Sequence, residues 1–222
     1  MRPLSIIVLD SETSKLTGGV YDVGYCIANK KGKIMQERNW LVQETITNSD
    51  SMMGAFFAGK TFTRYIPMLD SGTITLKPWL EIIDQMNQDI LDFKVNILAA
   101  YNLAFDRRVM AQTHIELGHT GKVLRSSLKQ LDLWRFVCES KLDCRLYKEI
   151  AVQQGWTSEA GNIRTTAEHA YRYLSQDYEF YESHTALDDA RIETAIMAFC
   201  FAAHKKIPYG IVDGQAWKIV NS

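Results

Sequence analysis

A short apolar run that ends in two carboxylates constrains the fold of this chain more than any other segment. Residues 6–9 are apolar and mostly β-branched, which is typical of a buried central strand, and Asp10 and Glu12 follow them. Side chains two positions apart on a strand point to the same side of the sheet. Two carboxylates ~5 Å apart repel by about 3 kcal/mol at an effective dielectric of ~20, and a divalent cation removes that cost. The pair therefore predicts a metal site.

The composition is that of an ordinary globular protein. The chain has 222 residues, of which 46% are hydrophobic and 23% charged. No Pro-, Ser- or Gly-rich linker divides it, so we expect a single domain over residues 1–222. No window reaches the ~18 uninterrupted apolar residues of a membrane span, and the N-terminus has no convincing signal peptide. These features favour a cytoplasmic location.

Cysteine usage and net charge narrow the class further. None of the four cysteines (Cys26, Cys138, Cys144 and Cys200) forms a Cys-x-x-Cys pair, so we expect reduced, structural residues. The formal net charge of −1 argues against a broad basic surface that grips long duplex nucleic acid. Nucleic-acid chemistry stays open, because bound divalent metals would change the local field.

Periodicity and turn signals predict an alternation of strands and helices. Strands are expected at residues 4–10, 20–28, 33–42, 95–100 and 130–133, with a hairpin between the second and the third. Helices are expected at residues 52–58, 78–93, 102–117, 146–153, 165–174 and 187–204. Three strands followed by alternating helices and strands indicate an α/β sheet that contains an antiparallel strand.

A second polar segment follows the strand expected at residues 95–100. It contains Asn102 and, at the start of the next helix, Asp106. Ligands in open α/β sheets gather at the C-terminal ends of strands, so Asp10, Glu12 and Asp106 are expected along one edge. The alternative for Asp106 is a first-turn acid that the helix dipole favours.

A third polar segment lies at the start of the last expected helix. Thr185 and Asp188 resemble a capping box in which Asp replaces the usual Glu. Asp189 is rotated ~100° further around the helix, so it is expected to face the other carboxylates. His184 lies just outside the helix, where an imidazole can reach into a site, and a surface histidine is the alternative.

These three segments, in this order, resemble the DEDDh 3′–5′ exonuclease family, also called DnaQ-like exonucleases, of the ribonuclease H-like fold. The family's four acids match Asp10, Glu12, Asp106 and Asp189, and its histidine matches His184. The resemblance spans about residues 4–203. Residues 166–174 and 182–193 look most like small, free-standing exonucleases encoded by bacteriophages.

The resemblance implies a fold and an activity. The expected fold is a mixed five-stranded sheet with one antiparallel strand, flanked by helices, with the carboxylates at its centre. The implied activity is metal-dependent hydrolysis of single-stranded DNA or RNA from the 3′ end, which releases nucleoside 5′-monophosphates. Hard oxygen ligands suit two Mg²⁺ or Mn²⁺ ions per active site better than zinc.

The family pattern also assigns roles to the matched residues. Asp10 would bridge both metals, while Glu12 and Asp189 would complete the site of the metal that holds the attacking water. Asp106 would help with the second metal, mainly through water. His184 would take the proton of the attacking water, and an unperturbed imidazole pKa of ~6.5 suits a base that works near neutrality.

By the same resemblance, three residues are candidates for substrate binding. The backbone of Thr13 would touch the terminal sugar, Asn102 would hydrogen-bond the substrate, and Phe105 would pack near its end. For Phe105, core packing at the helix start is an equal alternative. Residues 43–75 match no motif of the family, so substrate specificity is expected to reside there.

Two other functions compete with this interpretation. One is a catalytically weak nucleic-acid-binding or polymerase-accessory (proofreading) module of the same fold. The other is an unrelated metal-dependent phosphoesterase that acts on small molecules. The resemblance leaves a homodimer and a polymerase partner in trans open, and the sequence favours neither DNA nor RNA.

The remaining histidines and several residues near the acids are expected to be peripheral. His114 and His119 are five residues apart, not the four that place two zinc ligands on one helical face, so both are expected to be exposed. His169 is expected on a polar helix face. Arg107 and Arg108 follow Asp106 and either meet a substrate phosphate or form a solvated face.

Asp132 ends the strand expected at residues 130–133 and is a candidate to support the site without contacting substrate.

Overall fold

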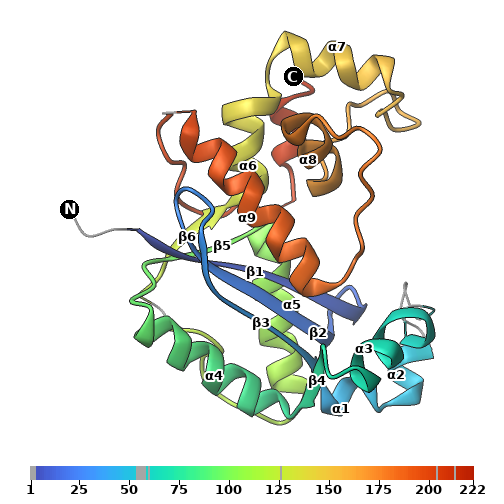
Figure 1. Cartoon of the computed structure of the whole chain (residues 1–222), viewed down its shortest axis with the longest axis vertical. Helices are drawn as coiled ribbons and strands as arrows, with labels where there is room; N and C mark the ends of the chain where they lie inside the picture. The colour runs from blue at the N-terminus through green and yellow to red at the C-terminus, as the bar shows by residue number, and fades with distance from the viewer. Residues whose placement is uncertain (1–3, 54–58, 60, 126, 204, 213) are drawn as a thin grey trace.

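Six strands form one mixed sheet in the described part of the chain (Figure 1). The computed structural model describes residues 4–53, 59, 61–125, 127–203, 205–212 and 214–222. The strand order is β4 (Thr75–Lys77), β3 (Ile34–Val42), β2 (Gly18–Asn29), β1 (Ser5–Lys15), β5 (Ile97–Ala100) and β6 (Lys129–Asp132). β2 runs antiparallel to both of its neighbours, and the other pairs are parallel.

The expected mixed sheet with one antiparallel strand is confirmed, and the expected number of strands is wrong. The additional strand is β4, which pairs with β3 at the edge of the sheet. It has three residues, too few to show an alternating pattern, so pairing with β3 and not its own periodicity defines it.

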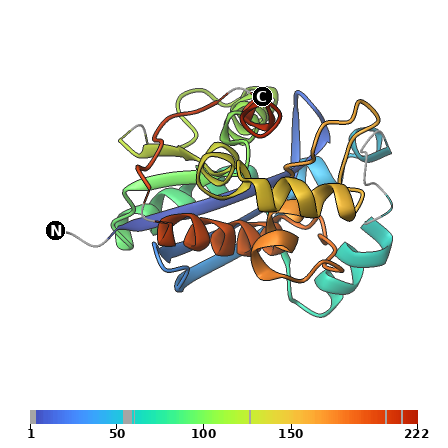
Figure 2. The ribbon, with the colours of Figure 1, turned by 90° about the horizontal axis from the view of Figure 1, so that it is seen from above.

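Helices cover both faces of the sheet (Figures 1 and 2). One face packs against α4 (Trp79–Asp92) and α5 (Leu103–Glu116). The other packs against α6 (Leu133–Val137), α7 (Arg145–Gln153), α8 (Ala167–Ser175) and α9 (Ala186–Ala202). The alternation along β1 decides which residues face which layer: Ile6 and Val8 join the α6–α9 side, and Ile7 and Leu9 join the α4–α5 side.

The segment between β3 and α4 packs as a small third unit. It contains α1 (Gln43–Ile46), α2 (Ser49–Met53), the π-helical turn η1 (Thr61–Tyr65) and α3 (Ile66–Asp70). Its apolar cluster is formed around Tyr21, Leu41, Met52, Tyr65 and Ile74. The helix expected at residues 52–58 begins earlier, as α2, and residues 54–58 lie outside the described residues.

The longer predicted helices are confirmed with shifts of one or two residues at most ends. Pro78 lies just before α4 as its N-cap, and Asn102 does the same for α5. α9 begins at Ala186, and residue 204, where the last helix was expected to end, lies outside the described residues. Two short turns, η2 (Cys138–Leu142) and η3 (Ala216–Ile219), were not expected.

Two composition-based expectations can be compared with the structure. All four cysteines are free thiols, as expected. Among the described helices, none has both the length and the apolar character that crossing a membrane requires.

β1 is longer than the sequence predicted, and its extra length places the acidic pair. Its pairing with β5 ends at Val8, whereas its pairing with β2 continues to Lys15. Asp10 and Glu12 therefore lie within the strand, on a part that extends beyond β5. A register shift between Glu12 and Thr13 follows directly. The edge of β1 that β5 leaves uncovered gives room for groups from other elements beside the acids.

α9 crosses the sheet at Gly24 of β2. A Cβ atom at this position would lie 2.2 Å from the backbone nitrogen of Leu187 and 2.3 Å from the carbonyl carbon of Ala186. No side chain fits between the strand and this helix start, so glycine is required for the close approach.

Replacing Gly24 with alanine should displace the start of α9. Since the clash is with backbone atoms, we expect Gly24→Ala to lower the free energy of unfolding by about 1–3 kcal/mol, measured by urea denaturation. Gly59→Ala is the matched control, because a Cβ atom there meets nothing within 4 Å. Equal stability of the two variants would contradict the packing described here.

Candidate functional site

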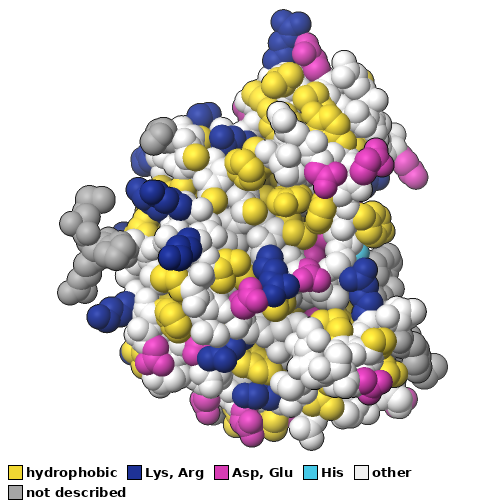
Figure 3. Space-filling view, viewed as in Figure 1, with side chains coloured by type: hydrophobic (Ala, Val, Ile, Leu, Met, Phe, Trp, Pro, Cys, Tyr) yellow, Lys and Arg dark blue, Asp and Glu magenta, His cyan; other side chains and the backbone are white. Residues whose placement is uncertain are grey.

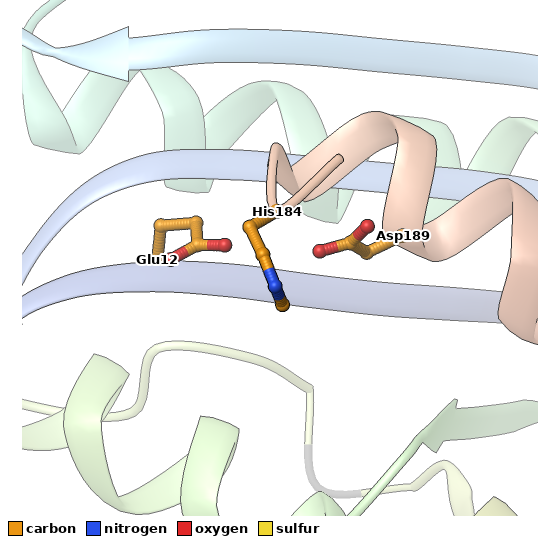
Figure 4. Close-up of side chains that lie close together, drawn as sticks. All are labelled: Glu12, His184 and Asp189. Atoms are coloured by element: carbon orange, nitrogen blue, oxygen red, sulfur yellow. The ribbon is translucent and has the colours of Figure 1, made fainter. Parts of the chain in front are cut away.

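Three side chains from distant parts of the sequence meet at the start of α9. Glu12, His184 and Asp189 each offer one ligand atom, and these atoms all lie within 4.8 Å of one another. Figure 4 shows the imidazole of His184 between the two carboxylates. Part of a histidine side chain is visible at the surface beside the segment that leads into α9 (Figure 3).

Asp10 lies in the same electrostatic cluster. Burial raises the pKa of its carboxyl well above the usual value, and the charges of Glu193, Asp106, Asp189 and Glu12 raise it further. Each of these carboxylates must therefore be near enough to Asp10 to disfavour its charge. The structure thus gathers all four predicted acids and the predicted histidine in one region.

Asp106 reaches this region from the first turn of α5. Its side chain is buried and its carboxylate accepts a hydrogen bond of 2.7 Å from the hydroxyl of Ser11. Burial raises the pKa of Asp106 to about 7 despite that hydrogen bond. Since Ser11 lies between Asp10 and Glu12 and points to the other face of β1, it links α5 to the strand that carries the acidic pair.

The turn between β5 and α5 depends on a left-handed residue. Asn102 has φ 69° and ψ 54°, a conformation that asparagine adopts more readily than most residues. The backbone amide of Phe105 then donates to the carbonyl of Asn102 at 2.8 Å. This sharp turn lets α5 begin directly after the strand and aims Asp106 at Ser11.

His184 also has a left-handed backbone, with φ 54°. Its Nδ1 lies 3.8 Å from a carboxylate oxygen of Glu182, and its ring makes an edge contact with Tyr181 at 6.4 Å between centroids. A non-glycine residue in this conformation costs about 1–3 kcal/mol and persists only where its surroundings hold it. The backbone here turns the imidazole into the carboxylate cluster.

The predicted capping box at the start of α9 is wrong. The hydroxyl of Thr185 donates to the Asp188 carboxylate at 3.0 Å. The Thr185 side chain accepts no hydrogen bond from a backbone amide of the helix, so it does not cap α9. Asp22 takes this role instead: its carboxylate accepts a hydrogen bond of 3.0 Å from the backbone amide of Ala186. The other carboxylate oxygen of Asp188 pairs with the guanidinium of Arg191 at 2.9 Å.

Asp22 is a structural residue of the site that the sequence analysis missed. It is fully buried, and it also accepts hydrogen bonds from the hydroxyl of Tyr65 at 2.8 Å and from the amide of Asn39 at 2.7 Å. Asp22 lies directly opposite Glu12 in the β1–β2 register. Only that pairing could have indicated its position, because no motif surrounds it.

Glu193 is a second missed residue. It is buried on α9, and its carboxylate accepts a hydrogen bond of 3.0 Å from the backbone amide of Tyr101 at the end of β5. Burial and then the charge of Asp106 raise the pKa of Glu193 well above its ordinary value. It follows Asp189 by four residues and so shares its helical face, which is the signal that would have identified it.

The three residues proposed to touch substrate lie around the acids. Thr13 is half-buried and follows the register shift in β1, and Asn102 is half-buried in the turn before α5. Phe105 packs partly against the apolar cluster on the α4–α5 side, and the guanidinium of Arg108 lies 5.5 Å from its ring centroid.

The structure corrects two expectations about histidines. His114 is buried and its Nδ1 accepts a hydrogen bond of 3.0 Å from the indole of Trp79, so it is part of the core and not exposed. His119 is half-buried beside it. His169 is also buried, against Trp156, and burial lowers its pKa to about 4. His114 in α5 and His169 in α8 both face inward, although histidine is a polar residue that a sequence pattern assigns to the surface.

Asp132 caps a helix and also contributes to the electrostatics of the acidic site. It is fully buried and its carboxylate accepts a hydrogen bond of 3.1 Å from the backbone amide of Arg135, which caps α6. Its charge contributes to the raised pKa of Asp106. It therefore acts on the acidic cluster from a distance.

The donor set fits a divalent cation. Of the three ligand groups within 4.8 Å of one another, the two carboxylates are of the type that Mg²⁺ and Mn²⁺ prefer, and the imidazole is a common ligand of other divalent metals. The acids around Asp10 disfavour each other's charge, so a cation between them would relieve a repulsion that the protein already bears. Glu12, His184 and Asp189 are the residues whose ligand atoms lie close enough together to hold it.

Comparisons with known proteins bear on the fold. No protein-family model matches the sequence, and no curated protein matches it. Among solved structures, the chain is similar to cell-death related nuclease 4 (CRN-4), with a TM-score of 0.56 and 12% identity over 92% of this chain and 66% of that one. It is also similar to Exonuclease X in complex with 5′ overhanging duplex DNA, with a TM-score of 0.48 and 15% identity over 97% and 99% of the two chains. The likeness to the first shows a shared fold.

The buried acids predict how stability depends on pH. Asp10, Asp106 and Glu193 have raised pKa values, so the folded state keeps protons that the unfolded chain releases above about pH 4. In a chelator, the melting temperature should therefore fall as the pH rises from about 5 to about 8. Mg²⁺ or Mn²⁺ should raise it by ~3–5 °C, and more at the higher pH.

Thermal unfolding followed by circular dichroism measures this effect. Asp10→Asn should flatten the pH dependence, because it removes one of the repelling charges, whereas Asp84→Asn, at an exposed position on α4, should not. A melting temperature that rises with pH in the chelator would contradict the assignment.

Proposed function

We propose that this chain is a metal-dependent 3′–5′ exonuclease of the DEDDh type, with one catalytic domain over residues 1–222. The observation that carries the proposal is the meeting of Glu12, His184 and Asp189 within 4.8 Å, beside Asp10 and the buried Asp106. A protein that only binds nucleic acid gains nothing from burying negative charges where phosphate must approach. The fold shared with a nuclease supports the same proposal.

We assign a role to each side chain of the site from its place in the structure. Asp10, Glu12, Asp106 and Asp189 hold two Mg²⁺ or Mn²⁺ ions. Bound there, such ions supply charge neutralisation for the phosphate and lower the pKa of a coordinated water. The imidazole of His184 lies between two of the carboxylates and accepts the proton of the attacking water, provided that the ring is neutral.

The proposed substrate is the 3′ end of single-stranded DNA or RNA, and the product is a nucleoside 5′-monophosphate. Thr13, Asn102 and Phe105 lie around the acids and are proposed to contact the terminal nucleotide. Asn102 is half-buried in the left-handed turn at the end of β5, and its amide is proposed to donate to a substrate oxygen. Phe105 is half-buried and offers a ring edge at the same end of α5.

One incubation series tests the proposal against its alternatives. The protein is mixed with 5′-labelled single-stranded DNA, 5′-labelled RNA and a dinucleotide, with and without Mn²⁺. Products that shorten stepwise from the 3′ end only when metal is present support the exonuclease. Binding without cleavage would identify an accessory module instead, and turnover of the dinucleotide alone would identify a small-molecule phosphoesterase.

Removing Asp10 should abolish hydrolysis. We expect Asp10→Ala to lower the metal-dependent rate of nucleotide release by at least ~10³-fold, because the remaining acids lose the carboxylate at their centre. The rate is measured by gel electrophoresis of labelled oligonucleotide. Asp84→Ala, on the exposed face of α4, is the control. Turnover near that of the unchanged protein would remove Asp10 from the site.

Removing His184 should alter the pH–rate profile as well as the rate. A general base must be neutral, so activity of the unchanged protein should decline as the pH falls and the imidazole becomes protonated. His184→Ala should lower the rate by ~10²–10⁴-fold and abolish this decline. His119→Ala serves as the control, and an identical profile in His184→Ala would exclude the imidazole as the base.

A further inference from the structure

A cavity of about 380 Å³ lies on the face of the sheet opposite α9. It is formed between α5 and the segment of residues 121–128 that leads into β6. Apolar side chains of Leu9, Leu98 and Met110 line its interior. Its volume falls in the range that small-molecule and nucleotide sites occupy.

Three cations line the same cavity. Arg107 comes from the first half of α5, and Lys122 and Arg125 come from the segment opposite. No acidic residue is among the described residues that line it, and none of the three cations takes part in a salt bridge within the described chain. By contrast, the exposed Arg191 is paired with Glu37 at 2.6 Å. The cavity therefore carries an uncompensated positive charge.

The segment that supplies two of these cations is anchored. The side-chain amide of Asn87 on α4 donates to the backbone carbonyl of Val123 at 2.9 Å and to that of Ile83 at 3.0 Å. The segment thus follows α4 (Figure 1). A second cavity of about 470 Å³ adjoins the first and shares Lys122 and Arg125 with it, again without an acidic lining residue among those described. The positive surface continues along this segment.

The cavity and the acidic site share two elements of the chain, with Leu9 on the opposite face of β1 from Asp10. Leu9 directly precedes Asp10 on β1, and Arg107 directly follows Asp106 on α5. A polyanion that leaves the acidic site past the first turn of α5 would meet Arg107 first. The net charge of −1 supplies no general attraction for such a strand, so a local cationic surface would help the site to retain it.

We propose that this cavity binds the single strand on the 5′ side of the hydrolysed bond. Arg107, Lys122 and Arg125 hold its phosphates, and the apolar interior takes one base. This inference rests on the proposed exonuclease function. It favours a nucleic-acid strand over an acidic peptide because a base is a flat apolar group attached to the anion, which matches a lining that is both apolar and cationic.

Binding without catalysis gives the first test. Fluorescence anisotropy with a 5′-labelled oligo(dT) of about 12 nucleotides, in a chelator, reads affinity when no metal is present. The triple variant Arg107→Ala, Lys122→Ala, Arg125→Ala should weaken binding about tenfold and reduce the slope of log K against log[salt] by about 2, since each lost phosphate contact contributes ~0.7. The triple variant Lys30→Ala, Lys31→Ala, Lys33→Ala, in the β2–β3 turn, is the matched control, because it also removes three exposed charges.

Kinetics give the second test. A dinucleotide is too short to reach from the acids into the cavity, so its hydrolysis reports the proposed function alone. The ratio of kcat/KM for the oligomer to that for the dinucleotide should fall about tenfold in the triple variant. Restoring charge with Arg107→Lys and Arg125→Lys should recover most of the ratio.

The outcomes separate the two proposals. An equal loss for both substrates would overturn the cavity assignment, because the effect would then arise at Asp106. An unchanged affinity and salt slope would overturn it as well. If the unchanged protein hydrolyses neither substrate, the exonuclease proposal fails, while the anisotropy measurement still reports on the cavity.

Discussion

Repulsion among buried carboxylates is the constraint on which the rest of this structure depends. Asp10 is surrounded by the charges of Glu193, Asp106, Asp189 and Glu12, and burial alone already disfavours its ionised form. Two of these neighbours are held in place by a hydrogen bond from another element: Ser11 donates to Asp106, and the amide of Tyr101 donates to Glu193. Without a cation, this arrangement raises the electrostatic free energy of the folded state. It suits cation binding, because the folded protein already holds the ligands in place.

Two helices bring these acids to β1 from opposite faces of the sheet, and different devices position them. α5 starts directly after β5 because Asn102 adopts a left-handed conformation. α9 lies against β2 because Gly24 has no side chain, and its first amide is capped by Asp22. Close backbone packing and a buried cap leave the start of α9 little freedom, so His184 and Asp189 are presented to Glu12 from a rigid element.

The sequence predicted the parts of the fold that repeat or stand in a motif. Alternation and helical periodicity located the long elements, and the spacing of the acids located the residues that meet at β1. It did not predict β4, which exists only through pairing, or Asp22, whose role comes from lying opposite Glu12. It also misjudged His114 and His169, because residue type describes an average environment whereas packing decides the particular one.

Asp22 also has a consequence for the segment between β3 and α4. Its carboxylate joins the hydroxyl of Tyr65 to the amide of Ala186, groups that lie far apart in the sequence. The segment is therefore not a detachable insertion. A shortened protein in which Val42 led straight to Pro78 would lose one of the donors that satisfy this carboxylate, and the helix that carries Asp189 would lose part of its support. Grafting a different segment at this place requires a new donor for Asp22.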